Sequence, residues 1–167
     1  FGYLLDKYDK WSRYEPEETG VLIAYASMYG NTESAAQVLA AKLVEKGVKN
    51  VVVHDVSNTH VSYLISDTFK YSHIVLASVT YNLGIYPVMH DFLMHMKALN
   101  MQKRTVGIIE NGSWAPKSGS LMKDFLDNQM KQMSILNSEV SMISSLGDNN
   151  KSEMDNLVDS IIDSMEG

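Results

Sequence analysis

The sequence predicts one α/β domain built as a three-layer doubly wound sandwich, in which a five-stranded parallel sheet has helices on both faces. Five short, β-branched apolar runs alternate along the chain with five longer stretches whose apolar residues recur every three or four positions. The 167 residues are enough for one continuous core, and they contain no internal repeat. Right-handed crossovers then favour the strand order 2-1-3-4-5, with a ligand crevice beyond the carboxyl ends of the strands.

The predicted strands are almost continuously apolar, as is typical of parallel strands that are buried on both faces. They are Val21–Ala26, Val51–Asp55, His73–Ser78, Thr105–Ile109 and Val140–Ser144. The predicted helices lie between and after these strands, and each is recognised by an apolar stripe. The first carries Ala36, Leu39, Ala40 and Leu43; the second spans about Val61–Tyr71; the third carries Met89, Phe92, Leu93 and Met96; the fourth carries Leu121, Met122, Phe125, Leu126, Met130 and Met133; the last carries Met154, Leu157, Val158, Ile161, Ile162 and Met165. Gly47 is expected to end the first helix, and Pro87 to stand in the first turn of the third.

Composition excludes several classes of function. Without cysteine the chain has no thiolate for a metal or an iron–sulfur cluster, so redox chemistry would need a bound organic cofactor. The net charge of -6 argues against a nucleic-acid partner, because clustered lysine and arginine carry phosphate binding. No apolar run is long enough to span a membrane, and a cytoplasmic location is expected. The five histidines lack the spacing of metal ligands, so we predict no metal site and no catalytic residue.

The turn between the first strand and the first helix has the chemistry of a phosphate site. Backbone N–H groups and the positive end of the helix dipole meet there. The turn offers hydroxyl and carboxamide donors and one glycine but no lysine or arginine, which fits neither the P-loop nor the dinucleotide Gly-x-Gly-x-x-Gly fingerprint. The alternative is a simple helix cap by Asn31 or Thr32, with Glu33 in the first turn. The candidate phosphate-binding residues are Ser27, Met28, Tyr29, Gly30, Asn31 and Thr32.

Three loops together resemble one family. The segment Ala26–Glu33 is similar to the phosphate loop of flavodoxins, Thr/Ser-x-Thr-Gly-Asn-Thr, which binds flavin mononucleotide (FMN). Its tyrosine before the glycine resembles the flavodoxin domain of the flavodiiron proteins, or A-type flavoproteins. The segment Ser78–Pro87 closely resembles that family's Ser-Pro-Thr-Tyr-Asn-Asn-Gly-Ile-Tyr-Pro loop, with Val79 and Leu83 as departures. The segment Glu110–Gly119 resembles a variant of a loop in which many members have Gly-Ser-Tyr-Gly-Trp.

The resemblance implies a flavodoxin-like fold, noncovalent FMN as the cofactor, and a ring held by the second and third loops. An isoalloxazine ring needs a flat wall, which Tyr81 and Trp114 could form, and hydrogen-bond partners for its polar edge. As alternatives, Tyr81 could cap the sheet edge and Trp114 could pack under the fourth helix. The candidate ring-binding residues are Ser78, Val79, Thr80, Tyr81, Asn82 and Gly84 in the second loop, and Asn111, Gly112, Ser113 and Trp114 in the third.

The first twenty residues lack the alternation of strands and helices. Tyr8–Ser12 resembles the linker that joins flavodoxin domains to an upstream metallo-β-lactamase-like diiron domain, and the chain starts at Phe1. We therefore expect residues 1–20 to be a linker from such a domain and residues 21–167 to be the FMN-binding domain. The resemblance implies electron transfer to a diiron centre that reduces oxygen or nitric oxide, across a head-to-tail homodimer, with a donor such as rubredoxin or a reductase. This chain alone should then pass electrons without completing the reaction.

Three other functions fit parts of the pattern. A free-standing short-chain flavodoxin would share the fold and the flavin site, although the linker-like start speaks against it. A flavodoxin-like NAD(P)H quinone reductase would be a complete enzyme, which turnover with NADH or NADPH would reveal. A signalling domain of receiver type needs a carboxylate at the end of the first strand, where Ala26 and Ser27 stand instead.

Overall fold

The computed structural model describes residues 2, 4–5, 12–27, 30–81, 84–112, 118–143 and 145–166. The strands are β1 (Glu18–Ala26), β2 (Val51–Asp55), β3 (Tyr71–Tyr81), β4 (Gly84–Ile85), β5 (Gln102–Gly112) and β6 (Lys131–Ile143). The helices are α2 (Asn31–Glu45), α3 (Val61–Lys70), α4 (Pro87–Ala98), α5 (Ser118–Gln129) and α6 (Asp148–Glu166). In the part of the chain so described, no helix combines the length and the apolar character needed to cross a membrane.

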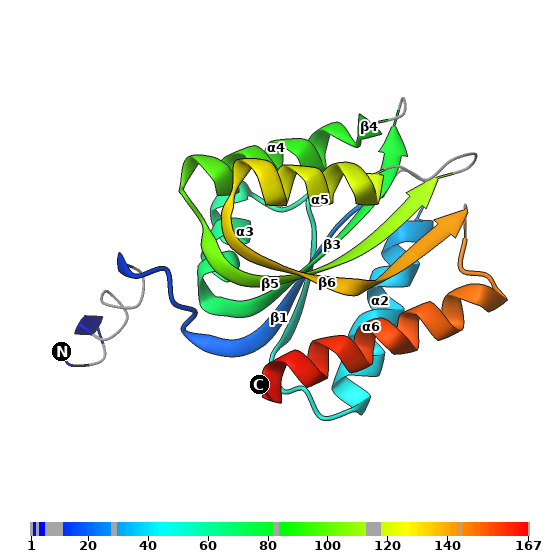
Figure 1. Ribbon diagram of the computed structural model, residues 1–167, viewed down its shortest axis with the longest axis horizontal. Coiled ribbons are helices and arrows are strands. Elements are labelled where there is room, and N and C mark those ends of the chain that lie inside the picture. Colours follow the sequence, from blue (N-terminus) through cyan, green and yellow to red (C-terminus); the bar gives the residue numbers. More distant parts are fainter. Residues whose placement is uncertain are drawn as a thin grey trace.

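The sheet has the predicted topology. Five parallel strands run in the order β2-β1-β3-β5-β6, which is the predicted order 2-1-3-4-5 with the short β4 left out of the count (Figure 1). In the middle of the sheet Val21 pairs with Val51 on one side and with His73 on the other. The unpredicted β4 is antiparallel to the end of β3, through Thr80 with Ile85 and Tyr81 with Gly84. Two residues are too few for the apolar pattern of a strand to be visible in the sequence.

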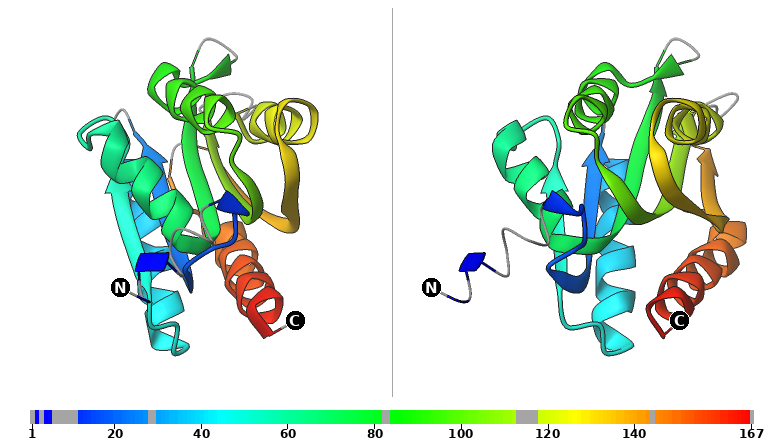
Figure 2. Two further views of the ribbon diagram at one scale, coloured as in Figure 1. Left: turned by 90° about the vertical axis from the view of Figure 1, so that its left-hand side faces the viewer. Right: turned by 60° about the vertical axis from the view of Figure 1, so that its left-hand side comes forward.

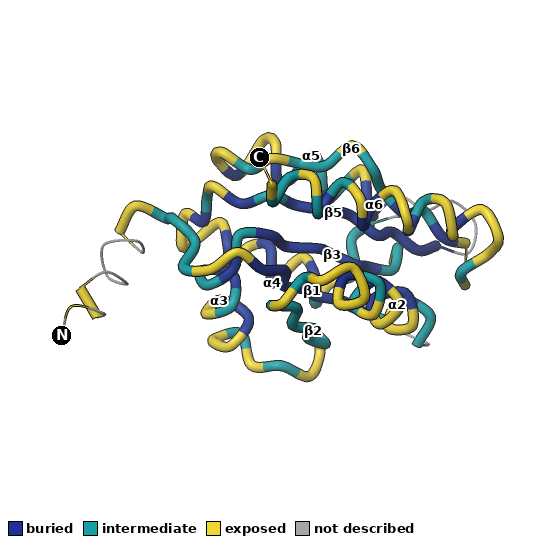
Figure 3. The backbone as a smooth tube through the Cα atoms, turned by 90° about the horizontal axis from the view of Figure 1, so that it is seen from below, coloured by how far each residue is buried: buried dark blue, intermediate teal, exposed yellow. Residues whose placement is uncertain are grey.

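The helices cover both faces of the sheet (Figures 1 and 2). Helices α3, α4 and α5 pack on one face around a core that includes Phe92 and Leu93, and α2 and α6 pack on the other around Leu39 and Leu157. The backbone tube is buried along β1, β3 and β5 and exposed along the outer sides of the helices (Figure 3). The apolar stripes predicted for the first, third and last helices therefore do face the sheet, as expected for amphipathic helices in a three-layer sandwich.

The last strand is the main departure from the predicted elements. It starts at Lys131, nine residues before the predicted Val140, because Lys131 pairs with Gln102 and Met133 pairs with Arg104. Helix α5 accordingly ends at Gln129, and Met133, which we placed on the fourth helix, lies in β6. Met130 and Met133 have helical spacing, whereas Met133 and Ile135 alternate as in a strand, so the local sequence fits both structures and the pairing with β5 decides between them.

The strands also reach further than predicted at their ends. Strand β1 begins at Glu18, inside the expected linker of residues 1–20, and the predicted end of the last strand, Ser144, lies outside the described residues. Strands β3 and β5 continue to Tyr81 and Gly112, so part of the second and third loops is strand.

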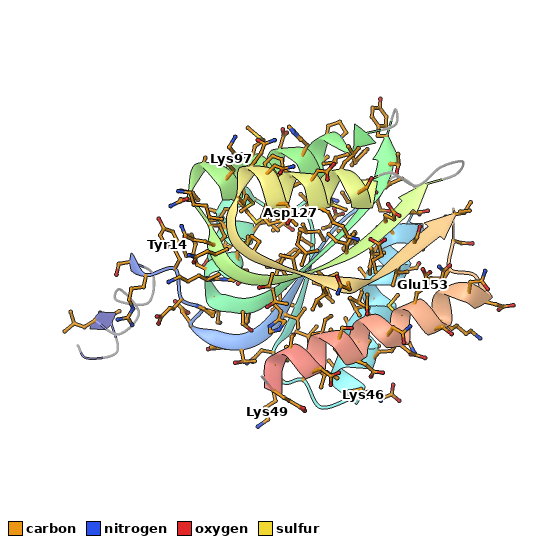
Figure 4. The ribbon with its side chains drawn as sticks, in the orientation of Figure 1. Tyr14, Lys46, Lys49, Lys97, Asp127 and Glu153 are labelled. Carbon is orange, nitrogen blue, oxygen red and sulfur yellow. The ribbon has the colours of Figure 1, made fainter. Side chains whose placement is uncertain are left out.

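The segment before β1 docks on the amino ends of the strands through Arg104. This side chain is 1% exposed, and its guanidinium donates to the carbonyls of Thr68 (2.9 Å), Phe69 (3.0 Å) and Tyr14 (2.6 Å). The Tyr14 ring stacks on Phe69 with centroids 6.3 Å apart, and Figure 4 shows Tyr14 between the first residues and the sheet. Burial lowers the pKa of Arg104 to about 10, so the group stays charged at neutral pH. One buried cation thus joins α3, β5 and the entering chain.

Candidate functional site

The three loops singled out by the sequence meet at one edge of the sheet. They follow β1, β3 and β5, whose carboxyl ends lie together on the side opposite the N-terminus (Figure 1). Of the candidate residues, the structure describes Ser27, Gly30, Asn31, Thr32, Ser78, Val79, Thr80, Tyr81, Gly84, Asn111 and Gly112. Met28, Tyr29, Asn82, Ser113 and Trp114 lie outside the described residues.

Helix α2 begins directly after a glycine with left-handed backbone. Gly30 has φ 85° and occupies the N-cap position, and Ser27 Oγ accepts a hydrogen bond from its N–H at 2.9 Å. Asn31 and Thr32 are therefore the first helical residues rather than the cap, which contradicts the alternative of a simple side-chain cap by either of them. Because glycine has no side chain to turn back onto the helix, Gly30 supplies no acceptor to the first-turn N–H groups.

Thr32 connects the first loop to the third. Its side chain is 1% exposed, and Asn111 Nδ2 donates to Thr32 Oγ1 at 3.4 Å. Strand β5 thereby contacts the first turn of α2. A buried hydrogen bond thus joins two loops that are almost eighty residues apart in the sequence.

Glu33, the acidic residue in the first turn of α2, is hydrogen-bonded to Tyr25. Tyr25 is buried in β1, and burial, followed by the charges of Asp55 and Glu33 and a hydrogen bond to Glu33, raises its pKa to about 12. The Tyr25 hydroxyl is thus neutral and bonds the Glu33 carboxylate. The negative charge nearest the start of α2 is directed toward β1 by this bond.

The start of the second loop is hydrogen-bonded to the start of α5. Ser118 Oγ donates to the Ser78 carbonyl at 3.0 Å, and Ser118 N–H donates to Thr80 Oγ1 at 3.1 Å. Ser78 is fully buried, and its hydroxyl donates to the Val79 carbonyl at 3.1 Å, so it serves the loop itself. Tyr81 is 41% exposed at the rim and meets Tyr86 edge to face, with ring centroids 5.8 Å apart. An exposed aromatic ring is therefore present where a flat ligand would need a wall.

The third loop begins over a buried carboxylate. Glu110 is 8% exposed, Gly119 N–H donates to its Oε2 at 2.8 Å, and Ser141 Oγ donates to its Oε1 at 3.0 Å. A Cβ on Gly119 would lie 2.6 Å from Oε2, so only glycine fits there without a shift. Our sequence reasoning did not select Glu110, Ser118 or Ser141. In the sequence Glu110 was visible as a carboxylate directly after the predicted strand Thr105–Ile109, whereas its partners depend on the fold.

The edge has the chemistry for a phosphate monoester beside a flat polar ring. The described residues of the three loops include hydroxyls, the carboxamides of Asn31 and Asn111 and the backbone N–H groups at the start of α2, and none of them is lysine or arginine. Neutral donors at a helix start bind a single phosphate group well, and they lack the cations that a triphosphate needs. Among the described residues, no group of three or more histidines and carboxylates is arranged to hold a metal ion.

Known proteins share this architecture. The family model for the flavodoxin domain matches residues 22–142. The rubredoxin-oxygen oxidoreductase of Megalodesulfovibrio gigas is 27% identical over 124 residues, which cover 74% of this chain and 30% of that protein. The chain spans about a third or less of the length of the curated relatives it matches.

Solved structures agree on the fold. The rubredoxin oxygen:oxidoreductase from Desulfovibrio gigas matches 99% of this chain and 40% of its own, with a TM-score of 0.89 and 21% identity. The flavodiiron protein from Giardia intestinalis matches 99% of this chain and 41% of its own, with a TM-score of 0.85 and 17% identity. A flavodoxin from the domain Archaea matches over 89% of this chain and its entire length, with a TM-score of 0.74 and 17% identity. The predicted resemblance to flavodoxins and to the flavodoxin part of flavodiiron proteins is confirmed.

Proposed function

Because this chain belongs to the flavodoxin domain family, we propose that it binds FMN noncovalently at the carboxyl edge of its sheet and transfers electrons through it. The observation that carries the proposal is the start of α2, where Gly30 supplies no side-chain cap to the first-turn N–H groups and the buried Thr32 contacts Asn111 of the third loop. If the phosphate of FMN binds there, the attached ring would lie between the second and third loops, which follow β3 and β5 at the same edge of the sheet.

The roles of the residues follow from their chemistry. Ser27, Asn31 and Thr32 would bind the phosphate together with the backbone of Gly30, and Tyr81 would lie against the ring. Asn111 and Gly112 precede the segment that would contact the polar edge of the ring. FMN supplies the redox chemistry when bound, while the protein binds the ring, orients it and sets its potential.

We propose further that the chain acts as the flavin domain of a longer protein of the flavodiiron kind. Its 40% share of the Desulfovibrio gigas structure and the docked segment before β1 support this assignment. In such a protein the electrons would pass to a diiron domain that reduces oxygen or nitric oxide, across a head-to-tail homodimer. The donor would be a rubredoxin or a reductase, and the location cytoplasmic. A free-standing flavodoxin remains the alternative, which co-purification of a diiron domain from the native source would exclude.

A titration with FMN tests the core of the proposal. The purified chain should quench FMN fluorescence on binding, turn yellow and release FMN on denaturation. The double variant Asn31→Ala/Thr32→Ala removes a carboxamide and a hydroxyl from the first turn of α2, and we expect its Kd for FMN to rise at least about a hundredfold, as for the loss of two hydrogen bonds to a charged group.

The control is Ser152→Ala/Asn156→Ala, which makes a similar change on the exposed side of α6 and should bind FMN as the wild type does. The circular dichroism and thermal midpoint of both variants show whether the fold is intact. Thr32→Ser keeps the hydroxyl and should recover part of the affinity. Equal FMN affinity in the wild type and the Asn31→Ala/Thr32→Ala variant would contradict the phosphate assignment.

A further inference from the structure

Glu110 is a buried carboxylate whose contacts are neutral. A carboxylate removed from water is costly unless hydrogen bonds satisfy it, and Glu110 receives one from Gly119 N–H and one from the Ser141 hydroxyl. Neither donor carries a charge. Surface acids pair with lysine, as Asp155 does with Lys42 at 2.9 Å, whereas the buried Glu110 has no cation partner among the described residues.

The two hydrogen bonds join three elements at the candidate site. Glu110 lies in β5, Gly119 in the first turn of α5, and Ser141 opposite Glu110 in β6. The adjacent Ser118 bonds Ser78 and Thr80 at the end of β3. The start of α5 is therefore held between the end of β3 and the end of β5.

Close packing makes the position of α5 depend on this side chain. The hydrogen atom that Gly119 has in place of a side chain faces Glu110, since an added Cβ would lie 2.6 Å from Oε2 and 2.8 Å from Cδ. A shift of the carboxylate would therefore move the first turn of α5.

We propose that Glu110 is a positioning residue for the start of α5, at the edge of the proposed flavin site, and that its buried carboxylate lowers the reduction potential of the bound flavin. The proposal rests on the proposed function. Reduction adds negative charge to the ring, and a carboxylate at the end of β5 opposes this change in a medium of low dielectric constant. The hydrogen bonds position the start of α5, and the charge acts on the ring.

Glu110→Gln separates the charge from the geometry. Its amide oxygen can accept from Gly119 N–H, and its amide nitrogen can donate to Ser141 Oγ, so both contacts survive without the charge. We expect the Kd of oxidised FMN to stay within a factor of about three of the wild type. The reduced form should bind about tenfold more tightly relative to the oxidised form, which raises the midpoint by about 30 mV for the two-electron couple. Glu45→Gln, an exposed acid at the end of α2, is the charge control and should leave the potential unchanged.

Glu110→Ala and Gly119→Ala remove the hold on α5. Hydrogen exchange in the first turn of α5 should become at least about tenfold faster in both variants without FMN, and the Kd for oxidised FMN should rise about tenfold. Gly119→Ala leaves the carboxylate in place, so it serves as the second variant if Glu110→Ala does not fold.

The outcomes are distinct. A wild-type chain that does not bind FMN overturns the proposed function and the inference with it. If the wild type binds FMN, an unchanged midpoint in Glu110→Gln overturns the role of the charge. Unchanged exchange and unchanged FMN affinity in Gly119→Ala overturn the positioning role.

Discussion

At the amino ends of the strands the chain buries two basic groups, Arg104 and His73, whereas at the carboxyl ends it buries the carboxylate of Glu110. The two ends also differ in the helix termini that they face. Arg104 bonds the last carbonyls of α3, and His73 contacts Ser164 in the last turn of α6. Glu110 bonds an N–H in the first turn of α5.

The helix direction explains this difference. In a parallel α/β sheet every crossover helix begins at the carboxyl ends of the strands and ends at their amino ends, so N–H groups collect at one edge and carbonyls at the other. Cations suit the carbonyl edge and anions suit the N–H edge. At the carbonyl edge the chain places its own basic groups and the segment before β1, whereas at the other edge α2 starts without a side-chain cap, and there we propose that the phosphate binds.

Arg104→Ala should have the largest effect on stability. It leaves the carbonyls of Thr68, Phe69 and Tyr14 without their buried donor, and we expect a loss of roughly 3–5 kcal/mol in the free energy of unfolding. Urea unfolding followed by circular dichroism measures it. Arg13→Ala, at an exposed arginine that pairs with Glu15, should cost less than about 0.5 kcal/mol.

The same variant tests whether the two ends are independent. If Arg104 serves only the amino end, the folded Arg104→Ala protein should bind FMN with the wild-type Kd, because its hydrogen bonds lie at the opposite edge of the sheet from the three loops. Arg104→Lys keeps the charge but lacks the planar guanidinium that bonds several carbonyls at once. Its stability should therefore lie between those of the wild type and Arg104→Ala. A large loss of FMN affinity in either folded variant would show that the amino end controls the site.

His73 should make the amino end sensitive to acid. Burial lowers its pKa from 6.5 to about 4, which outweighs the attraction of a cation to the end of α6. Ser164 Oγ donates to the Ile161 carbonyl and is left to accept from His73 Nε2–H, while Ser72 Oγ lies 2.6 Å from Nδ1. These contacts fit the neutral ring.

The sign of the pH effect follows from linkage. The unfolded chain, with an ordinary histidine pKa, binds the proton more readily than the folded chain, so stability falls as the pH falls from about 6.5 and the loss is complete below about 4. The loss due to His73 reaches roughly 3 kcal/mol. Urea unfolding between pH 7 and pH 4 should show a flatter dependence in His73→Gln than in the wild type. The exposed His95→Gln should follow the wild type, and an equal slope in His73→Gln would contradict the role of burial.

The fold could be predicted because its signals are local. The stripe with Leu39 and the one with Phe92 and Leu93 each identify a helix without knowledge of any partner, and the crossover rule then orders the strands. The first half of β6 could not be predicted in this way. Lys131 and Met133 are strand residues only because the distant Gln102 and Arg104 pair with them.

The candidate site divides in the same manner. The start of α2 could be predicted, since the strand, the glycine and the helix follow one another in the sequence. The contacts of Arg104 and Glu110 could not, because a charge beside an apolar run is typical of a surface residue. Only the fold brings the carbonyls of α3 to Arg104, and Ser141 to Glu110.

The sharpest contrast between the ends of the sheet comes from two glycines that flank one helix. Gly30 precedes α2 with φ 85°, and Gly47 follows it with φ 97°, where Gly47 N–H and Val48 N–H bond the last carbonyls of the helix. Neither has an atom within 4 Å of an added Cβ. Alanine at either position should therefore cost about 1 kcal/mol through backbone strain alone.

The two variants should differ in ligand binding. Gly30→Ala strains the turn that exposes the first N–H groups of α2, so its FMN affinity should fall about tenfold in a fluorescence titration, well beyond its effect on folding. Gly47→Ala carries the same strain at the carbonyl edge and should bind FMN as the wild type does. Because the backbone penalty is matched, a difference in FMN Kd can come only from the edge at which the strain is placed. Equal FMN affinity in the two variants would mean that the start of α2 does not hold the phosphate.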